Sequence, residues 1–330
     1  MKRSLLMLAA GVAALALVPG LASPYQLQIA TQLLIFAILL TGLDIAVGHA
    51  GLVSIAHGGL FGIGAYTTAV LTIDHGWSSW ATLPVAMALS VLIGLLVGLL
   101  TLRLEGHYFV VATLGAGILI EIAARNWTSV THGDLGLSPV VVSSILGIDF
   151  NDPVTFYFLV AFICLVIVMV CTSMMARRTG QKLRAIRDNT PLANAVGINV
   201  ARARLVAFMV SAAIAALAGS LHATNLTYIS PAVASFDIAV TAVLAVIVGG
   251  RATVLGPFAG AAIFVVLPEI LRGADQYRLV IMGALLIITI IFAPDGLVGR
   301  TKALFRWCRD RVAPRPAPER RSAPREGANV

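Results

Sequence analysis

Seven ionisable residues interrupt the apolar runs of this sequence, and they are the first candidates for chemistry. They are Asp44, His49, His57, Glu121, His222, Asp237 and Glu269. In apolar surroundings such groups are costly unless they are paired or meet water, so they often line polar paths or pass protons. Asp44, Asp237 and Glu269 lie near the ends of their runs, where a side chain can reach the interface. His57 and Glu121 lie deeper, although a histidine in a Gly-rich helix also serves in packing.

The sequence lacks the motifs of common catalytic and energy-converting sites. It contains no GxxxxGK[ST] phosphate loop, no HExxH, no GxSxG and no paired cluster of Cys and His. The three cysteines, Cys164, Cys171 and Cys308, have no metal or redox spacing. We therefore expect no enzyme activity, no cofactor and no metal site. A protein of this kind either uses an ion gradient, conducts its solute passively, or takes energy from a partner protein.

The composition predicts a membrane protein, because 59% hydrophobic and 12% charged residues leave too little polar surface to cover a soluble globule of 330 residues. Uncharged runs long enough to cross about 30 Å of hydrocarbon occur at 4–22, 81–102, 153–175 and 205–224. Less regular runs lie at 27–43, 52–73, 107–124, 238–250, 253–271 and 279–293. The predicted fold class is all-α, a polytopic bundle of about ten transmembrane helices with the broken, Gly-rich helices inside.

The basic residues predict the orientation of this bundle. If the chain starts inside and crosses ten times, 20 of its 23 Lys and Arg residues lie in the cytoplasm. Both termini are then inside. The net charge of +8 follows from this topology and not from a nucleic-acid surface, because the basic residues flank apolar runs. Residues 1–23 also have the form of a cleavable signal peptide, which would leave the remaining topology unchanged.

Two regions follow from these patterns. Residues 1–300 form the expected transmembrane domain, and residues 301–330 form a basic, Pro- and Arg-rich tail with almost nothing to bury. The tail is expected to be disordered in the cytoplasm, either simply solvated or in contact with anionic membrane lipid.

Glycines are concentrated in the segment "GHAGLVSIAHGGLFGIGAY", residues 48–66. Small residues three and four apart let helix backbones approach closely and suit a broken helix beside a path through the membrane. The spacing of Gly51, Gly58 and Gly62 recurs at Gly249, Gly256 and Gly260, which favours a parallel internal repeat. The candidate residues for the path are Gly51, His57, Gly58, Gly62, Tyr66, Glu121, Gly256 and Gly260.

A long basic loop, residues 176–205, contains the apolar patch "PLANAVGI". Its sequence predicts a short helix that begins at a polar, Pro-marked turn and ends at Gly197, on the cytoplasmic face. Leu192, Ala193 and Val196 are expected to be buried only against a cytoplasmic partner, as a knob in a groove. The candidate contact residues are Arg187, Asp188, Asn189, Pro191, Leu192, Ala193, Asn194, Ala195, Val196, Gly197 and Ile198.

The stretch "GQKLRAIRDNTPLANAVGINVARARLVAF" resembles the cytoplasmic coupling loop of the LivM-type permeases of branched-chain amino acid ABC importers. The resemblance extends to "GHAGLVSIAHGGLFGIGAYTTAVL", "LRLEGHYFVVATLGAG", "NWTSVTHGDLGL", "VIVGGRATVLGPFAGAAIF" and "FAPDGLVG", in the expected order.

This resemblance implies a permease subunit in the bacterial inner membrane. Its expected partners are a homologous LivH-like permease, two cytoplasmic ABC ATPase subunits and a periplasmic substrate-binding protein. The expected cargo is a branched-chain amino acid or a related small amino acid or amide. The alternative is a self-sufficient secondary transporter or channel in which His57 and Glu121 relay protons.

Overall fold

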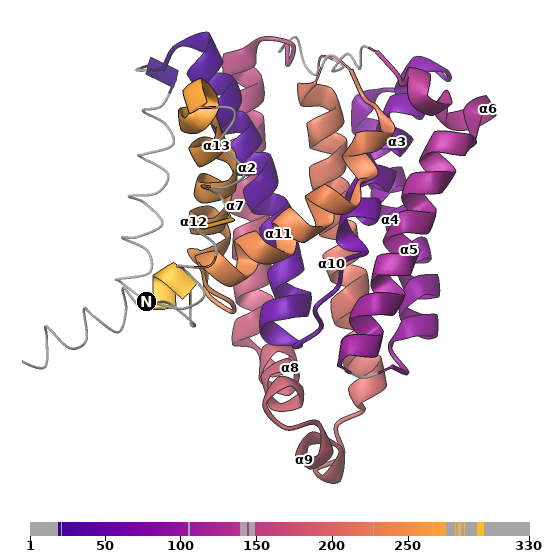
Figure 1. Ribbon diagram of the computed structural model, residues 1–330, viewed down its shortest axis with the longest axis vertical. Coiled ribbons are helices and arrows are strands. Elements are labelled where there is room, and N and C mark those ends of the chain that lie inside the picture. Colours follow the sequence, from indigo (N-terminus) through magenta and orange to yellow (C-terminus); the bar gives the residue numbers. More distant parts are fainter. Residues whose placement is uncertain are drawn as a thin grey trace, which may run out of the picture.

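The described part of the chain consists of helices joined by short turns (Figure 1). The computed structural model describes residues 19–20, 22–104, 106–138, 144, 149–226, 228–274, 281, 283–284, 287 and 296–299. Within these ranges there is no β-strand, and one isolated antiparallel bridge joins Leu137 to Ile229. The predicted all-α class is confirmed. The expected spans at 4–22 and 279–293 and the tail at 301–330 lie outside the described residues, apart from isolated positions.

The first long helix, α2 (Pro24–Asp44), begins at a capping box. Ser23 Oγ accepts a hydrogen bond from the backbone N–H of Gln26, and the Gln26 side chain accepts one from the N–H of Ser23. Pro24 lies in the first turn, where its missing N–H leaves no helical bond unmade. The helix continues into a π-helical turn, η1 (Ile45–His49), and is mostly buried from residue 34 onward. It is therefore a central helix of the bundle.

Five of the described helices are long and apolar enough to cross a membrane. Besides α2 with η1, they are α4 (Ser79–Thr101), α5 (His107–Asn126), α7 (Pro153–Ala176) and α10 (Val200–Asn225). Each coincides with a predicted span. Whereas α2 and α10 are mostly buried, α4, α5 and α7 expose most of their apolar surface. Such surface is stable against lipid or a partner helix, so the chain is a multi-pass membrane protein.

Three further predicted spans are shorter helices. They are α3 (His57–Ile73), α11 (Phe236–Gly249) and α12 (Gly256–Ala261), which continues through the π-helical turn η4 (Ala262–Val266) into α13 (Leu267–Ile270) and the 3₁₀ turn η5 (Leu271–Ala274). Figure 1 shows α11 running obliquely across the middle of the bundle. The remaining short helical turns are α6 (Thr128–Thr131), η2 (Gly133–Leu135) and η3 (Pro231–Ala234). Short, interrupted helices thus occur where Gly-broken segments were predicted, while the total of ten spans stays a prediction.

The helices α2, α3 and α4 have counterparts in α10, α11 and α12. The pair α3 and α4 packs against α10, and the pair α11 and α12 packs against α2. In Figure 1, α2 runs toward the end that carries α8, whereas α10 runs away from it. The two sets are therefore inverted relative to each other. The glycines that share a spacing include Gly58 and Gly62 near the start of α3 and Gly256 and Gly260 of α12, and the predicted parallel repeat stays a prediction.

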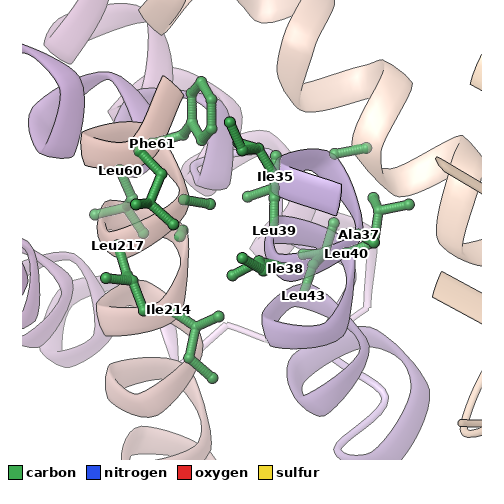
Figure 2. Close-up of a cluster of buried hydrophobic side chains, with 14 of the residues drawn as sticks. Ile35, Ala37, Ile38, Leu39, Leu40, Leu43, Leu60, Phe61, Ile214 and Leu217 are labelled. Carbon is green, nitrogen blue, oxygen red and sulfur yellow. The ribbon is translucent and has the colours of Figure 1, made fainter. Parts of the chain in front are cut away.

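The core lies where α2, α3 and α10 meet, and Figure 2 shows its side chains gathered between these helices. They include Ile35, Ile38, Leu39 and Leu43 of α2, Leu60 and Phe61 of α3, and Ile214 and Leu217 of α10. A Cβ atom at Gly64 would collide with the backbone of Ala216, and one at Gly219 would collide with the carbonyl oxygen of Phe61. Helices α3 and α10 thus touch backbone to backbone, as small residues allow.

Candidate functional site

The loop predicted at 176–205 forms two helices that project from one end of the bundle (Figure 1). They are α8 (Arg178–Asp188) and α9 (Thr190–Ala195). In α8 the residues Gly180, Leu183 and Ile186 are buried, whereas its basic side chains are mostly exposed. This amphipathic pattern holds α8 against the bundle with its polar face outward.

Helix α9 is fixed at both ends by its own sequence. Asn189 Oδ1 accepts a hydrogen bond of 2.9 Å from the N–H of Leu192. At the other end Gly197 has a φ of 82°, and the N–H groups of Gly197 and Ile198 donate to the carbonyls of Asn194 and Ala193, both at 3.0 Å. This is the Schellman arrangement. The predicted short helix ending at Gly197 is confirmed.

The apolar side chains of α9 divide into two groups. Leu192 and Val196 are 61% and 68% exposed, whereas Ala193 is only 2% exposed. Ala193 packs against Ile186 and Val200 because α9 folds back onto α8 and the start of α10. The expectation that Ala193 is buried only against a partner is therefore wrong. The two large exposed apolar side chains here, Leu192 in α9 and Val196 at its C-cap, are called the α9 knob.

Two arginines of the same loop form hydrogen bonds to other residues of this protein. Arg187 Nη1 donates to the carbonyl oxygen of Gly48 at 2.7 Å, and Arg204 donates to Thr190 Oγ1 at 3.1 Å. The side chain of Arg187 also pairs with Asp188, at 2.9 Å. Arg187 therefore links α8 to the end of α2.

A second candidate site lies where α3 meets η3 and the first turn of α11. A Cβ atom at Gly58 would lie 2.8 Å from both Ala239 Cβ and the carbonyl oxygen of Ser235. One at Gly62 would collide with Ala234. Both glycines therefore permit a close approach of two short helices, each of which follows an irregular segment. We call this contact the α3–α11 junction.

His57 is fully buried beside this junction, and both of its ring nitrogens have partners. Nδ1 lies 3.1 Å from Ser54 Oγ and Nε2 lies 2.6 Å from Ser211 Oγ. The ring also meets the edge of Phe208. The imidazole thus connects the loop before α3 to α10, which is the arrangement of a packing histidine.

Glu121 connects α5 to the start of α11. One carboxylate oxygen accepts from Arg125 Nη2 at 2.9 Å, and the other accepts from the N–H of Phe236 at 3.3 Å. The N–H of Phe236 is one of the first-turn donors that a helix cannot satisfy itself. Glu121 therefore caps α11 from a neighbouring helix.

We expect Glu121→Gln to keep this cap and Glu121→Ala to lose it, because the amide oxygen of Gln can still accept from Phe236 N–H. Loss of a capping acceptor costs about 1 kcal/mol, so the Ala variant should unfold at a lower temperature in detergent. Fluorescence-monitored melting of both variants measures this. Equal destabilisation of the two would instead point to the ion pair with Arg125.

Tyr66 borders an apolar cavity of about 400 Å³ between α3, α4 and α5. The cavity is lined mainly by aliphatic side chains of these helices, with Trp127, Thr131 and Ala234. Within the described residues the buried Tyr66 hydroxyl has no hydrogen-bond partner. Tyr66 is thus a polar residue at the edge of an otherwise apolar cavity.

The predicted path residues do not converge on one point. Gly58, Gly62 and Tyr66 share the junction and its cavity, and Glu121 adjoins them through Phe236. Other predicted residues lie elsewhere: Gly51 beside Arg187, and Gly256 and Gly260 between α11 and α12. In the described ranges, no group of three His, Cys, Asp or Glu side chains is placed to hold a metal ion.

The partners of the residues at these sites could not be identified from the sequence. Ser54 and Ser211 hold His57 but lie 157 residues apart in the chain, and a lone serine in an apolar run gives no distinctive signal. Ala234 and Ser235 contact Gly62 and Gly58 of α3 at the junction. The one available signal was Pro231, which marks an irregular turn in an apolar stretch.

Comparisons with known proteins agree on one family. Residues 25–290 match the model described as branched-chain amino acid transport system / permease component. The chain is 30% identical over 307 residues to the high-affinity branched-chain amino acid transport system permease protein LivM of Salmonella typhimurium, covering 86% of this chain and 72% of that protein.

Two more distant relatives have other names. The identity to LivH of Escherichia coli, another permease protein of that transport system, is 26% over 283 residues, or 80% of this chain and 91% of LivH. The identity to the fructose import permease protein FruF of Bifidobacterium longum is 25% over 265 residues, or 77% of this chain and 70% of FruF. No solved structure matches the chain.

Proposed function

Because the chain belongs to the family of branched-chain amino acid transport system permease components, we propose that it forms half of the translocation path of an ABC importer. A LivH-like permease supplies the other half, two cytoplasmic ATPase subunits supply the energy, and a periplasmic binding protein delivers the substrate. The substrate is a branched-chain amino acid or a related small amino acid or amide. The site of action is the bacterial inner membrane.

The observation that carries this proposal beyond family membership is the α9 knob. Leu192 and Val196 are exposed on a short helix whose two ends are capped, at the end of the bundle that carries the basic helix α8 (Figure 1). Exposed apolar side chains on a rigid, polar projection fit a groove of a cytoplasmic partner. The remaining coupling residues, Asp188, Asn189, Pro191, Asn194, Ala195, Gly197 and Ile198, shape or surround the knob.

The α3–α11 junction supports a place for the path. Two short helices that each follow an irregular segment meet here, and a cavity lined by Gly62 and Tyr66 adjoins their contact. Interrupted helices at a substrate path are common in membrane transporters. An apolar cavity also suits an aliphatic side chain, which loses no hydrogen bonds on entering it.

Reconstitution tests the whole proposal. The chain is co-expressed with the LivH-like permease and ATPase subunits, placed in vesicles and supplied with the binding protein and labelled leucine. We expect uptake that requires ATP and both ATPase subunits. Uptake by this chain without the ATPases would favour the self-sufficient transporter, and ATP-driven uptake of a different solute would correct the substrate class.

We also propose ten spans with both termini inside, and expect reporter fusions at residues 78, 135 and 228 to report the outside, and those at 185 and 310 the inside. The loops that carry residues 78, 135 and 228 lie together at the end opposite α8 (Figure 1), joined by hydrogen bonds from Tyr228 to Leu135 and between His132 and Asp74. The basic residues favour the cytoplasm for α8. Phosphatase and fluorescent reporters give complementary readouts, and an outside signal at 185 would contradict both the topology and the role of α9.

A further inference from the structure

Three chain segments meet at the π-helical turn that ends α2. From one side, the last turn of α8 reaches the carbonyl oxygen of Gly48 through Arg187 Nη1, at 2.7 Å. The stem of Arg187 rests on Gly51, where a Cβ atom would lie 3.0 Å from its Cγ. The projecting helices are thus fastened to the end of α2 and to the start of the loop that leads to α3.

From the other side, the turn between α11 and α12 is fastened to the same place. Asp44 Oδ1, which is buried, accepts a hydrogen bond of 2.8 Å from the N–H of Ala252. Gly48 makes this contact possible, because a Cβ atom there would collide with Asp44 Oδ1 and lie 2.6 Å from Ala252 N. The turn itself is braced by Thr253 Oγ1, which donates to Gly250 O and accepts from Gly256 N.

Both segments held at this turn lead to the α3–α11 junction. The loop at 50–56 runs directly into the first turn of α3, where Gly58 lies. Helix α11 runs from the turn at 250–255 to Ala239, which contacts Gly58. A displacement of α8 would therefore reach the junction from both of its sides.

We propose that Asp44 and Arg187 are positioning residues that couple movement of α8 and α9 to the α3–α11 junction. The inference rests on the proposed function, because it assigns these residues the transfer of ATPase movement to the path. Arg187 holds α8 to the π-helical turn, and Asp44 holds the α11–α12 turn to it. A buried hydrogen bond suits this purpose, because its loss leaves an unsatisfied donor or acceptor.

The test uses the importer reconstituted with both permeases, both ATPase subunits and the binding protein, and it measures substrate uptake and ATP hydrolysis in the same vesicles. Asp44→Leu removes the acceptor, whereas Asp44→Asn retains an oxygen for Ala252 N–H. Arg187→Met removes the donor but keeps the stem on Gly51, whereas Arg187→Lys can still donate to Gly48. We expect uptake per ATP hydrolysed to fall about tenfold in the Leu and Met variants, the scale of one lost buried hydrogen bond, and to stay near wild type in the Asn and Lys variants.

Wild-type uptake tests the proposed function, and the differences among variants test the coupling. Equal uptake per ATP in wild type, Asp44→Leu and Arg187→Met would overturn the inference while leaving the transporter intact. If Asp44→Asn were as defective as Asp44→Leu, the inference would also be overturned. The charge of the Asp44 carboxylate, which lies 3.6 Å from His49 Nδ1, would then matter and not its hydrogen bond to Ala252. If Asp44→Leu fails to co-purify with its partners, the comparison of Arg187→Met with Arg187→Lys tests the coupling alone.

Discussion

Replacing Leu192 with Asp is expected to release the ATPase subunits while the permease stays in the membrane. Leu192 is 61% exposed on α9 and belongs to neither the core nor the cluster around Ala193. Its substitution therefore costs the isolated chain little. In the complex an aspartate at the centre of a small apolar contact would be buried without a partner, which weakens association on the order of a hundredfold.

Co-purification of the ATPase subunits with the tagged permease measures this effect. Ala185→Asp is the matched control, because it adds the same charge at an exposed position of the neighbouring α8. Ala193→Asp should behave differently from both, since Ala193 is packed against Ile186 and Val200 and its replacement should unfold α9 itself. If Leu192→Asp retained the ATPase subunits fully, the α9 knob would not be part of the interface with them.

Gly62→Leu is expected to abolish uptake. Even a Cβ atom at position 62 would collide with Ala234, so the larger side chain must push η3 away from α3. It would also enter the cavity that Tyr66 borders. Both effects deform the α3–α11 junction, whereas the spans on either side keep their apolar surfaces and insert as before.

Uptake into vesicles is measured together with the amount of permease in the membrane. Ala81→Leu is the control, because Ala81 is exposed on α4 and the substitution adds bulk to a membrane-facing position. Normal uptake by Gly62→Leu would show that the junction takes no part in transport. Loss of the protein from the membrane would mean that Gly62 serves folding instead.

The long helices were predictable because their signal is local. The expected spans at 107–124, 153–175 and 205–224 match α5, α7 and α10 to within about five residues at each end. A run of apolar residues of sufficient length has one stable state in lipid, namely a helix. The α9 cap was predictable for a similar reason, because Gly197 lies within two residues of the end of the short apolar helix.

Burial within the short elements could not be predicted. In the six residues of α9, Leu192 and Ala193 are neighbours with opposite surroundings, and only the fold of α9 onto α8 decides which is buried. His57 gave the same difficulty, since one of its partners, Ser211, comes from a different helix. The inverted pairing of helices depends on long-range packing, which glycine spacing alone does not encode.

The backbone contact between α3 and α10 limits how this protein can change shape. Gly64 rests on the backbone of Ala216, and Gly219 rests on that of Phe61, so neither helix can slide along the other without first separating. The two helices are therefore expected to move together as one rigid body. Any alternation between outward and inward states must leave this pair intact and place its hinges elsewhere, so amide hydrogens along α3 and α10 should exchange slowest through the whole transport cycle.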